Sequence, residues 1–381
     1  MHAFASNFRL SDRPTCRRLT GPLMTALCAG LSQVPTPAQA QAAVPPSTVT
    51  VYGVVDACVV SHAAAGGARL QVNGGGCYFG SRLGFRGSED LGNGLRVHFQ
   101  LESGFSADTG ALGQGGRIFG RKALVGLSGR FGTVEAGRDY APTFYLLSPV
   151  DPMQLAIGSA TATIWSGSPA SGSGRTNNAL AYVSPTVGAL SARVLVAPGE
   201  QGAPLASRGG DTLGAGVYYR GKQLLAGLTY ARVRNANATA DDSATTLGLK
   251  FDFGSFSLAA ASQVGAWEGT RTVAAPSSAT SMFSRRYRSH LAGGTLKLGA
   301  HSLSASFKRY DDRTPANFDA DILSAVYIHR LSKRTQLYAG VTRLDNRRGS
   351  SYGAADGNGA YTGAAPGGSS RVFDLGISHF F

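Results

Sequence analysis

Apolar and polar side chains take turns at every second position along much of this chain. In residues 246–253 and 302–308, Leu, Phe and Ala occupy the odd positions, whereas Thr, Gly, Ser, Lys and Asp occupy the even ones. Residues 97–102 show the same alternation, with Val, Phe and Leu at the odd positions. Because successive side chains on a β-strand point to opposite faces, each segment predicts a strand with one apolar and one polar face.

The connections between these strands alternate between short and long. Short turns rich in Gly, Pro or charged residues lie at 89–93, 129–130, 185–187, 221–222, 254, 299–300 and 331–334. Long polar or glycine-rich stretches lie at about 61–78, 105–116, 139–174, 198–210, 234–242, 267–286, 311–318 and 345–370. Seven turns and eight loops join sixteen strands, and their strict alternation is typical of an up-and-down membrane barrel. We therefore predict an all-β fold, a transmembrane antiparallel β-barrel of sixteen strands.

The polar faces of the predicted strands carry Lys, Arg, Asp, Glu and Ser. Such side chains are costly in a dry protein core but not in a water-filled channel. A barrel of sixteen strands is wide enough to hold water, and its closed sheet pairs every backbone group within lipid. The pattern therefore favours an aqueous pore.

Composition agrees with a barrel and excludes a helical membrane protein. Charged residues make up only 15% of the chain, below the roughly 25% that is usual in soluble domains. There are 52 Gly, 18 Phe and 14 Tyr, which suit many turns and an aromatic belt. After the N-terminal region, no apolar run approaches the roughly 20 residues that a spanning helix needs.

The N-terminal region has the pattern of a secretory signal peptide. Arginines at positions 9, 13, 17 and 18 precede a short apolar segment at 19–31, and Ala38, Gln39 and Ala40 fit a cleavage site. We therefore expect a signal peptide over 1–40 and a barrel domain over 41–381, in the outer membrane of a Gram-negative cell. Removing four Arg and one Asp lowers the net charge from +14 to +11.

This positive charge does not indicate a nucleic-acid partner. Nucleic-acid-binding domains usually cluster Lys and Arg on one element. Here the basic residues are spread along the chain, and most of them are Arg. A solvated surface or a charged pore explains that distribution better.

Two cysteines remain in the expected mature chain, Cys58 and Cys77. They are either two isolated small residues or one disulfide that closes the first hairpin, which the export compartment permits. Simple alternation places them on opposite sides of the barrel wall, which favours isolated residues. Two thiols without a nearby pair of histidines do not predict a metal site.

No motif in the sequence indicates catalysis or a cofactor. The histidines are scattered, without the spacing of a metal-binding pair. The nucleophile elbow of serine hydrolases and the glycine-rich loops that bind nucleotides are both missing from the sequence. We therefore expect neither an enzymatic activity nor a cofactor.

Several segments resemble the general porins of Gram-negative bacteria. The resemblance is carried by residues 48–57 (TVTVYGVVDA), 80–94 (GSRLGFRGSEDLGNG), 97–105 (VHFQLESGF), 117–140 (RIFGRKALVGLSGRFGTVEAGRDY), 175–185 (RTNNALAYVSP) and 379–381 (HFF). It is strong over the first half of the chain and rests mainly on the strand rhythm in the second half. The resemblance implies a sixteen-stranded barrel in outer-membrane lipid, assembled as a homotrimer, with a long third loop folded into the lumen.

The resemblance also implies a pore constriction with arginines on one wall and carboxylates on the third loop. The arginines that match the family pattern are Arg82 in SRLGF, Arg121 in RKALVGL, Arg175 in RTNNA and, as a fourth, Arg138 in GRDY. Strand alternation agrees for Arg82, because its neighbour Leu83 then faces the lipid. Lys122, beside Arg121, is then expected to face the lipid, the trimer contact or the loop.

Carboxylates are few in the third loop, 139–174, whose acids are Asp139 and Asp151. We expect Asp151 and Glu102 to be the counter-charges of the arginines. Several Arg beside few carboxylates concentrate anions, because a low-dielectric wall focuses the electric field. The sequence therefore predicts a passive channel for small anionic or neutral solutes. The alternative is a non-conducting outer-membrane barrel that serves as an adhesin or a structural protein.

The terminal residue, Phe381, has two compatible interpretations. It fits an aromatic girdle at the membrane surface. The family resemblance implies a second role, recognition by the barrel-assembly machinery. Alternation over Phe373, Leu375 and Ile377 predicts a last strand that reaches the periplasmic rim with Phe381 facing outward.

Overall fold

A computed structural model describes residues 48–64, 67–156, 174–199, 208–235, 238–266, 286–315, 317–355, 361–362 and 365–381. All of them fall within one unit, residues 45–381. The signal peptide predicted over 1–40 lies outside the described residues and stays a prediction. Within the described ranges, no helix has the length and apolar character needed to cross a membrane.

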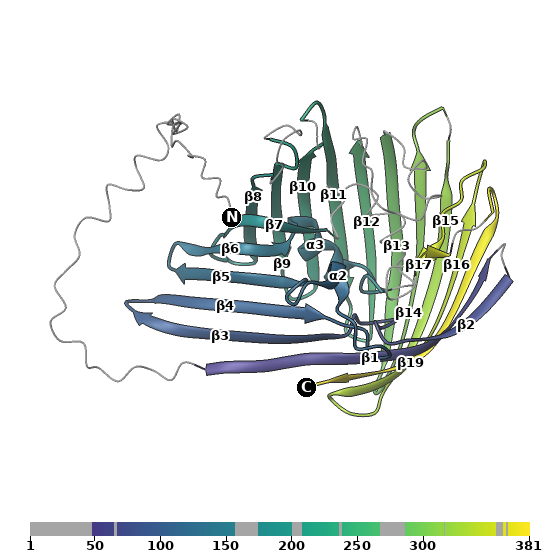
Figure 1. The fold of residues 1–381 in the computed structure, drawn as a ribbon, viewed down its shortest axis with the longest axis horizontal. Coiled ribbons are helices and arrows are strands. Elements are labelled where there is room, and N and C mark those ends of the chain that lie inside the picture. The colour runs from purple at the N-terminus through teal and green to yellow at the C-terminus, as the bar shows by residue number, and fades with distance from the viewer. Residues whose placement is uncertain are drawn as a thin grey trace, which may run out of the picture. The chain divides into compact units, whose positions relative to one another are not determined.

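Sixteen strands form the wall of a closed antiparallel barrel (Figure 1). They are β1 (Thr48–Ala64), β3 (Arg82–Gly92), β4 (Leu95–Gly104), β5 (Lys122–Gly129), β6 (Gly132–Tyr140), β7 (Arg175–Val183), β8 (Leu190–Ala197), β9 (Thr212–Arg220), β10 (Leu224–Arg234), β11 (Asp241–Asp252), β12 (Phe256–Ala266), β13 (Arg286–Leu298), β14 (His301–Asp312), β15 (Ala320–Arg330), β16 (Thr335–Asn346) and β19 (Ser369–Phe380). Each strand pairs with its neighbours in the chain, and β1 pairs with both β3 and β19. That last pairing closes the barrel and confirms the predicted fold.

Each of the seven predicted turns and eight predicted loops lies between two consecutive wall strands, although part of the first loop is itself strand. The residues of the β3–β4 turn suit its backbone conformation. Asn93 and Gly94 both have positive φ, at 54° and 79°, a conformation that Asn and Gly adopt more readily than other residues. Another turn, between β11 and β12, is held by the Asp252 carboxylate, which accepts the Gly254 N–H at 2.8 Å.

The first long connection differs from the prediction, which placed an irregular loop at 61–78. Strand β1 continues to Ala64, and β2 (Gly67–Asn73) folds back along its Cys58–Ala64 half. The other half of β1 pairs with β3. The prediction was wrong here because β2 offers only a short alternation of apolar residues, Ala68, Leu70 and Val72, beside glycines, which is too short a pattern to recognise.

The apolar positions of the strands face outward, as alternation predicts. Leu247 is 47% exposed and Leu375 63% exposed, and both are flanked along the strand by residues that point inward. Phe373, Ile377 and Phe381 continue the exposed apolar row of β19. Such a continuous apolar surface suits contact with lipid and would be unusual in water.

A short helix of the third loop, α3 (Pro142–Val150), lies against the inner faces of β9 to β12 (Figure 1). Gly227 and Gly248 leave space on the wall for it, since a Cβ on either residue would meet the side chain of Leu146. The Tyr218 hydroxyl donates a hydrogen bond to the Pro142 carbonyl at 2.7 Å. The described part of the third loop is thus folded into the lumen.

Three smaller elements complete the described structure. They are α2 (Gly113–Gly116), β17 (Ala354–Ala355) and β18 (Tyr361–Thr362). The β17–β18 ribbon lies in the connection between β16 and β19, and α2 lies between β4 and β5. None of the three takes part in the barrel wall.

A disulfide joins Cys58 to Cys77, with the two Cα atoms 6.0 Å apart. Both cysteines are buried on the inner side, which corrects the expectation from alternation. Cys77 lies in the irregular segment 74–81 and not in a strand, so alternation does not apply to it. The Asp56 carboxylate holds the same segment by accepting the Cys77 N–H at 2.9 Å and the Phe79 N–H at 3.1 Å.

Replacing both cysteines with Ser is expected to lower the free energy of unfolding by about 3 kcal/mol, because the disulfide constrains a short loop of the unfolded chain. The measurement is the guanidinium midpoint of detergent-folded protein. A reductant should lower the midpoint of the native protein and leave the Cys58→Ser/Cys77→Ser variant unchanged. Equal midpoints for both proteins without reductant would contradict the prediction.

Candidate pore constriction

Two of the predicted arginines share one buried carboxylate on the inner wall. The Arg121 guanidinium donates from Nε to Glu102 Oε1 at 2.6 Å, and Arg82 Nε lies 3.9 Å from Glu102 Oε2. Tyr52 completes the group by donating its hydroxyl to Glu102 Oε2 at 2.9 Å. Strand pairing explains why these side chains lie together. Arg82 pairs with Gly104 across β3 and β4, and Glu102 pairs across β4 and β5 with Lys122, the residue that follows Arg121.

The other two predicted arginines lie near Tyr140 at the end of β6. The Arg175 guanidinium lies 4.4 Å from the centre of the Tyr140 ring and hydrogen-bonds its hydroxyl. Arg138 donates from Nε to the Gly120 carbonyl at 2.8 Å, and also to the Asn177 side chain. For the described residues, neither guanidinium forms an ion pair with a carboxylate.

A β-bulge shapes this end of β6. The pairing of β6 with β7 shifts register between Gly137 and Asp139, where Asn177 and Asn178 of β7 lie opposite Arg138 alone. Gly137 has a φ of 135°, which strongly favours glycine. Bulges often re-aim a side chain near a functional site, and this one lies where the wall meets the third loop.

Asp151 does not join the arginines. It lies at the end of α3, where its carboxylate accepts the Met153 N–H at 3.0 Å. Its Oδ2 lies 3.2 Å from the Nζ of Lys308 on β14, and both side chains are buried. The structure therefore pairs Glu102 with two of the predicted arginines, Arg82 and Arg121, and pairs Asp151 with a lysine on another part of the wall.

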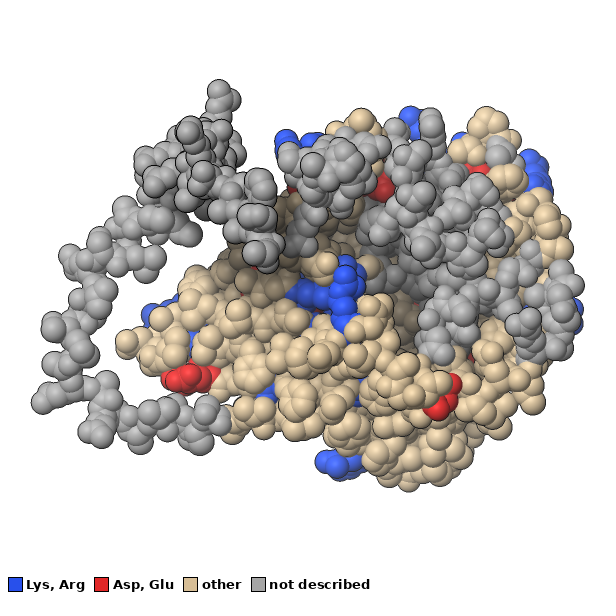
Figure 2. All heavy atoms as spheres, viewed as in Figure 1, with Lys and Arg blue, Asp and Glu red and all other residues tan. Residues whose placement is uncertain are grey.

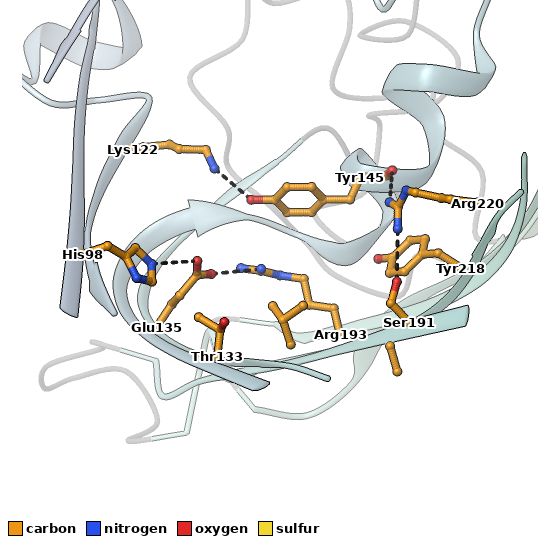
Figure 3. A pocket seen from close by; sticks show the side chains of 11 residues that line it. His98, Lys122, Thr133, Glu135, Tyr145, Ser191, Arg193, Tyr218 and Arg220 are labelled. Atoms are coloured by element: carbon orange, nitrogen blue, oxygen red, sulfur yellow. Dashed lines mark hydrogen bonds and ion pairs between the residues drawn. The ribbon is translucent and has the colours of Figure 1, made fainter. Parts of the chain in front are cut away.

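The structure also shows a second charged cluster that the sequence reasoning missed (Figure 3). Lys122 Nζ lies 3.0 Å from Asp139 Oδ1, and Arg193 bridges Asp139 at 2.5 Å and Glu135 at 2.9 Å. Figure 3 draws Lys122, Arg193 and Glu135 of this cluster. These residues line a pocket of about 360 Å³ or contact its lining. Arg193 could have been found by alternation, because Leu195 and Ala197 on β8 point inward with it.

Tyr145 of α3 connects the third loop to this cluster. Its hydroxyl donates to Asp139 Oδ2 at 2.6 Å and accepts from Lys122 Nζ at 2.9 Å. Burial, with the nearby Asp139 carboxylate, raises the pKa of the Tyr145 hydroxyl above its usual value, so it stays protonated and donates. Lys122 thus faces the loop, one of the three expected surroundings, because Arg121 precedes β5 and strand alternation does not separate the pair.

Positive charge predominates around these inner residues. Arg220 adds a further guanidinium beside the pocket and donates to the Ser191 hydroxyl and the Tyr145 carbonyl, both at 3.2 Å. Figure 2 shows a group of Lys and Arg atoms near the middle of the face in view. The arrangement can attract anions, because several guanidinium groups face few carboxylates.

The chain is similar to known outer-membrane channels over most of its length. Residues 24–349 match the family described as Gram-negative porin. Outer membrane porin protein 32 of Delftia acidovorans is 32% identical and covers 89% of this chain and 96% of its own length. An outer-membrane porin of Bordetella pertussis is 29% identical over 83% of this chain and 92% of its own.

Solved structures agree with the sequence comparisons. The anion-selective porin from Comamonas acidovorans superposes with a TM-score of 0.75 at 28% identity, covering 88% of this chain and all of that one. A Salmonella typhi outer-membrane protein at 14% identity has a TM-score of 0.63, which shows the shared fold alone. The chain therefore belongs to the Gram-negative porins and is a non-enzymatic channel of the outer membrane.

Proposed function

We propose that this porin prefers anions and that Arg82, Arg121 and Arg175 form the positive wall of its constriction, with Arg138 beside them. The carrying observation is the charge balance: among these four arginines, the described structure shows ion pairs only for Arg82 and Arg121, and both share Glu102. Arg keeps its charge at any working pH and presents several donors to an anion. Asp151 is not a counter-charge in this proposal, because it pairs with Lys308.

Similarity to a channel of stated selectivity supports the proposal. The solved porin of Comamonas acidovorans, 28% identical to this chain, is described as anion-selective. The third loop adds support, because α3 narrows the lumen from inside. Asp151 is the one carboxylate in the described part of this loop that lies beyond the barrel wall. Rings of Arg or Lys are the expected device for anion pores.

Liposome swelling with three solutes of one carbon skeleton tests the preference. Glucose, gluconate and glucosamine are close in size and differ in charge, so size exclusion affects them similarly. We expect gluconate to enter fastest and glucosamine slowest, because positive charge raises the local concentration of anions. Equal rates for the charged solutes would show an unselective pore, and faster glucosamine entry would reverse the assignment.

We also propose a homotrimer, on the strength of the family resemblance. The wall strands expose a continuous apolar surface that either lipid or a second subunit can cover. Native mass spectrometry of the detergent-extracted protein should give three times the subunit mass. A monomer that conducts with unchanged selectivity would contradict this proposal and leave the fold intact.

Phe381 is proposed to act in assembly as well as in closing the barrel. Its backbone exchanges two hydrogen bonds with Gly53 of β1, at 3.1 and 3.2 Å. Deleting Phe381 should reduce the heat-modifiable, folded form in outer-membrane fractions several-fold, because both the backbone bonds and the ring are lost. Phe381→Gly keeps the backbone bonds, so a loss as large as that of the deletion would point to the ring. Wild-type levels for both variants would contradict the assembly role.

A further inference from the structure

Two histidines that are distant in the sequence lie side by side on the barrel wall. His301 begins β14, His329 is the last residue but one of β15, and the two residues pair directly across these strands. The Nδ1 atoms of the two rings lie 3.3 Å apart, and the ring centres lie 4.6 Å apart. Sequence spacing could not indicate this pair, because its members are 28 positions apart.

The pair lies on the outer face of the barrel, at its periplasmic rim. Leu303 and Tyr327 are 50% and 43% exposed, and alternation places His301 and His329 on the same faces of their strands. His301 directly follows the short turn at 299–300, and the short turns of such barrels are on the periplasmic side. His301 is itself exposed, so a small ion in the periplasm can reach the pair without entering the pore.

Hydrogen bonds among the side chains do not satisfy both contacts of the His301 ring. Its Nδ1 atom lies 2.6 Å from the Tyr327 hydroxyl oxygen as well as 3.3 Å from His329 Nδ1. An imidazole nitrogen carries either one proton or one lone pair, so it makes one well-directed hydrogen bond at a time. In every tautomer, therefore, one of the two contacts at His301 Nδ1 is left without a hydrogen bond.

The separation of the two nitrogens suits a shared metal ion. Two nitrogens that each lie about 2.0–2.1 Å from a tetrahedral Zn²⁺ are about 3.3–3.4 Å from one another. The rings are now stacked, with 23° between their planes, so both lone pairs reach one point only after the rings turn about their Cβ–Cγ bonds. This torsion is soft in histidine, and the exposure of His301 leaves room for the turn.

We propose that His301 and His329 bind one divalent transition-metal ion at the periplasmic rim, with water completing its coordination. Among the described residues, His, Cys, Asp and Glu form no group of three or more that could hold a metal, so this site has two protein nitrogens and open positions. Imidazole ligands suit Cu²⁺, Zn²⁺ and Ni²⁺, and Cu²⁺ binds most tightly to a given set of nitrogen ligands. The site is separate from the pore and does not depend on the proposed anion preference.

The test titrates Cu²⁺ into the untagged, detergent-folded porin at neutral pH and follows binding by electron paramagnetic resonance. The spectrum of the native protein should show hyperfine coupling to two imidazole nitrogens. His301→Gln and His329→Gln should each weaken Cu²⁺ binding by more than about tenfold, since even the loss of a residue that only orients a metal ligand costs about 10- to 100-fold. Both substitutions change residues at the rim of the wall, and the heat-modifiable band confirms that each variant is folded.

A matched variant removes a histidine from another part of the outer face. His290 is exposed on β13, so His290→Gln should leave both the Cu²⁺ affinity and the two-nitrogen spectrum as they are in the native protein. Equal affinity in all four proteins would place the bound ion elsewhere and overturn the proposal. Equal weakening by all three substitutions, or coupling to a single nitrogen in the native protein, would also overturn it.

Discussion

Channels with Arg82, Arg121 and Arg175 replaced by Gln are expected to lose their preference for anions and to favour cations. The permeability ratio of chloride to potassium should fall about tenfold or more, because a charged cleft concentrates counter-ions by about ten- to a thousandfold. Glu102 would then lack its two guanidinium partners and would attract cations. The measurement is the reversal potential of the purified variant in a planar bilayer under a KCl gradient.

Two further variants separate this effect from simple damage to the barrel. Glu102→Gln removes the carboxylate shared by Arg82 and Arg121, so its reversal potential should move in the anion-selective direction. Arg130→Gln changes a basic residue in a short turn and should leave the reversal potential unchanged. A triple variant that forms channels with native selectivity would contradict the assignment of the constriction.

Loss of the Asp151 charge is expected to destabilise the protein by about 3 kcal/mol, since breaking a buried ion pair leaves the other charge uncompensated. Asp151→Asn can still accept the Met153 N–H through its one oxygen, and it loses the pair with Lys308 together with the weaker bond from the Leu155 N–H at 3.3 Å. We also expect flickering currents, because α3 loses an anchor to β14 while its other contacts remain. Guanidinium midpoints and single-channel recordings measure the two effects.

The double variant and an exposed pair provide the controls. Asp151→Asn/Lys308→Met should be more stable than the sum of the single changes predicts, because neither charge is then left alone. Asp345→Asn breaks an exposed pair with Arg343, 2.8 Å long, and should cost less than about 1 kcal/mol. Equal losses for Asp151→Asn and Asp345→Asn would show that the buried pair does not hold the loop.

The barrel wall could be predicted from sequence because two independent patterns agree there. Strand alternation places Leu247 and Leu375 on the apolar face, and the outward exposure of both side chains confirms this. The spacing of turns and loops gives the strand number. Both patterns are local, so one sequence is enough to recognise them.

Residues outside the strands could not be placed in the same way. Cys77 and Asp151 both lie in irregular segments, where the direction of a side chain depends on contacts distant in sequence. Cys77 joins Cys58 across the turn of the chain, and Asp151 reaches Lys308, which follows it by 157 residues. Arg193 and Lys122 lie in strands, so the strand pattern covers both of them. The family resemblance implied constriction roles for other residues.

The reversal potential of the native porin under a KCl gradient tests the central claim most directly. Large, stable conductance steps with a potential that favours chloride are predicted, because the arginines outnumber the carboxylate that balances them. The potential should shrink as the salt concentration is raised, since salt screens exposed charges. Open channels with a potential that favours potassium would contradict the account.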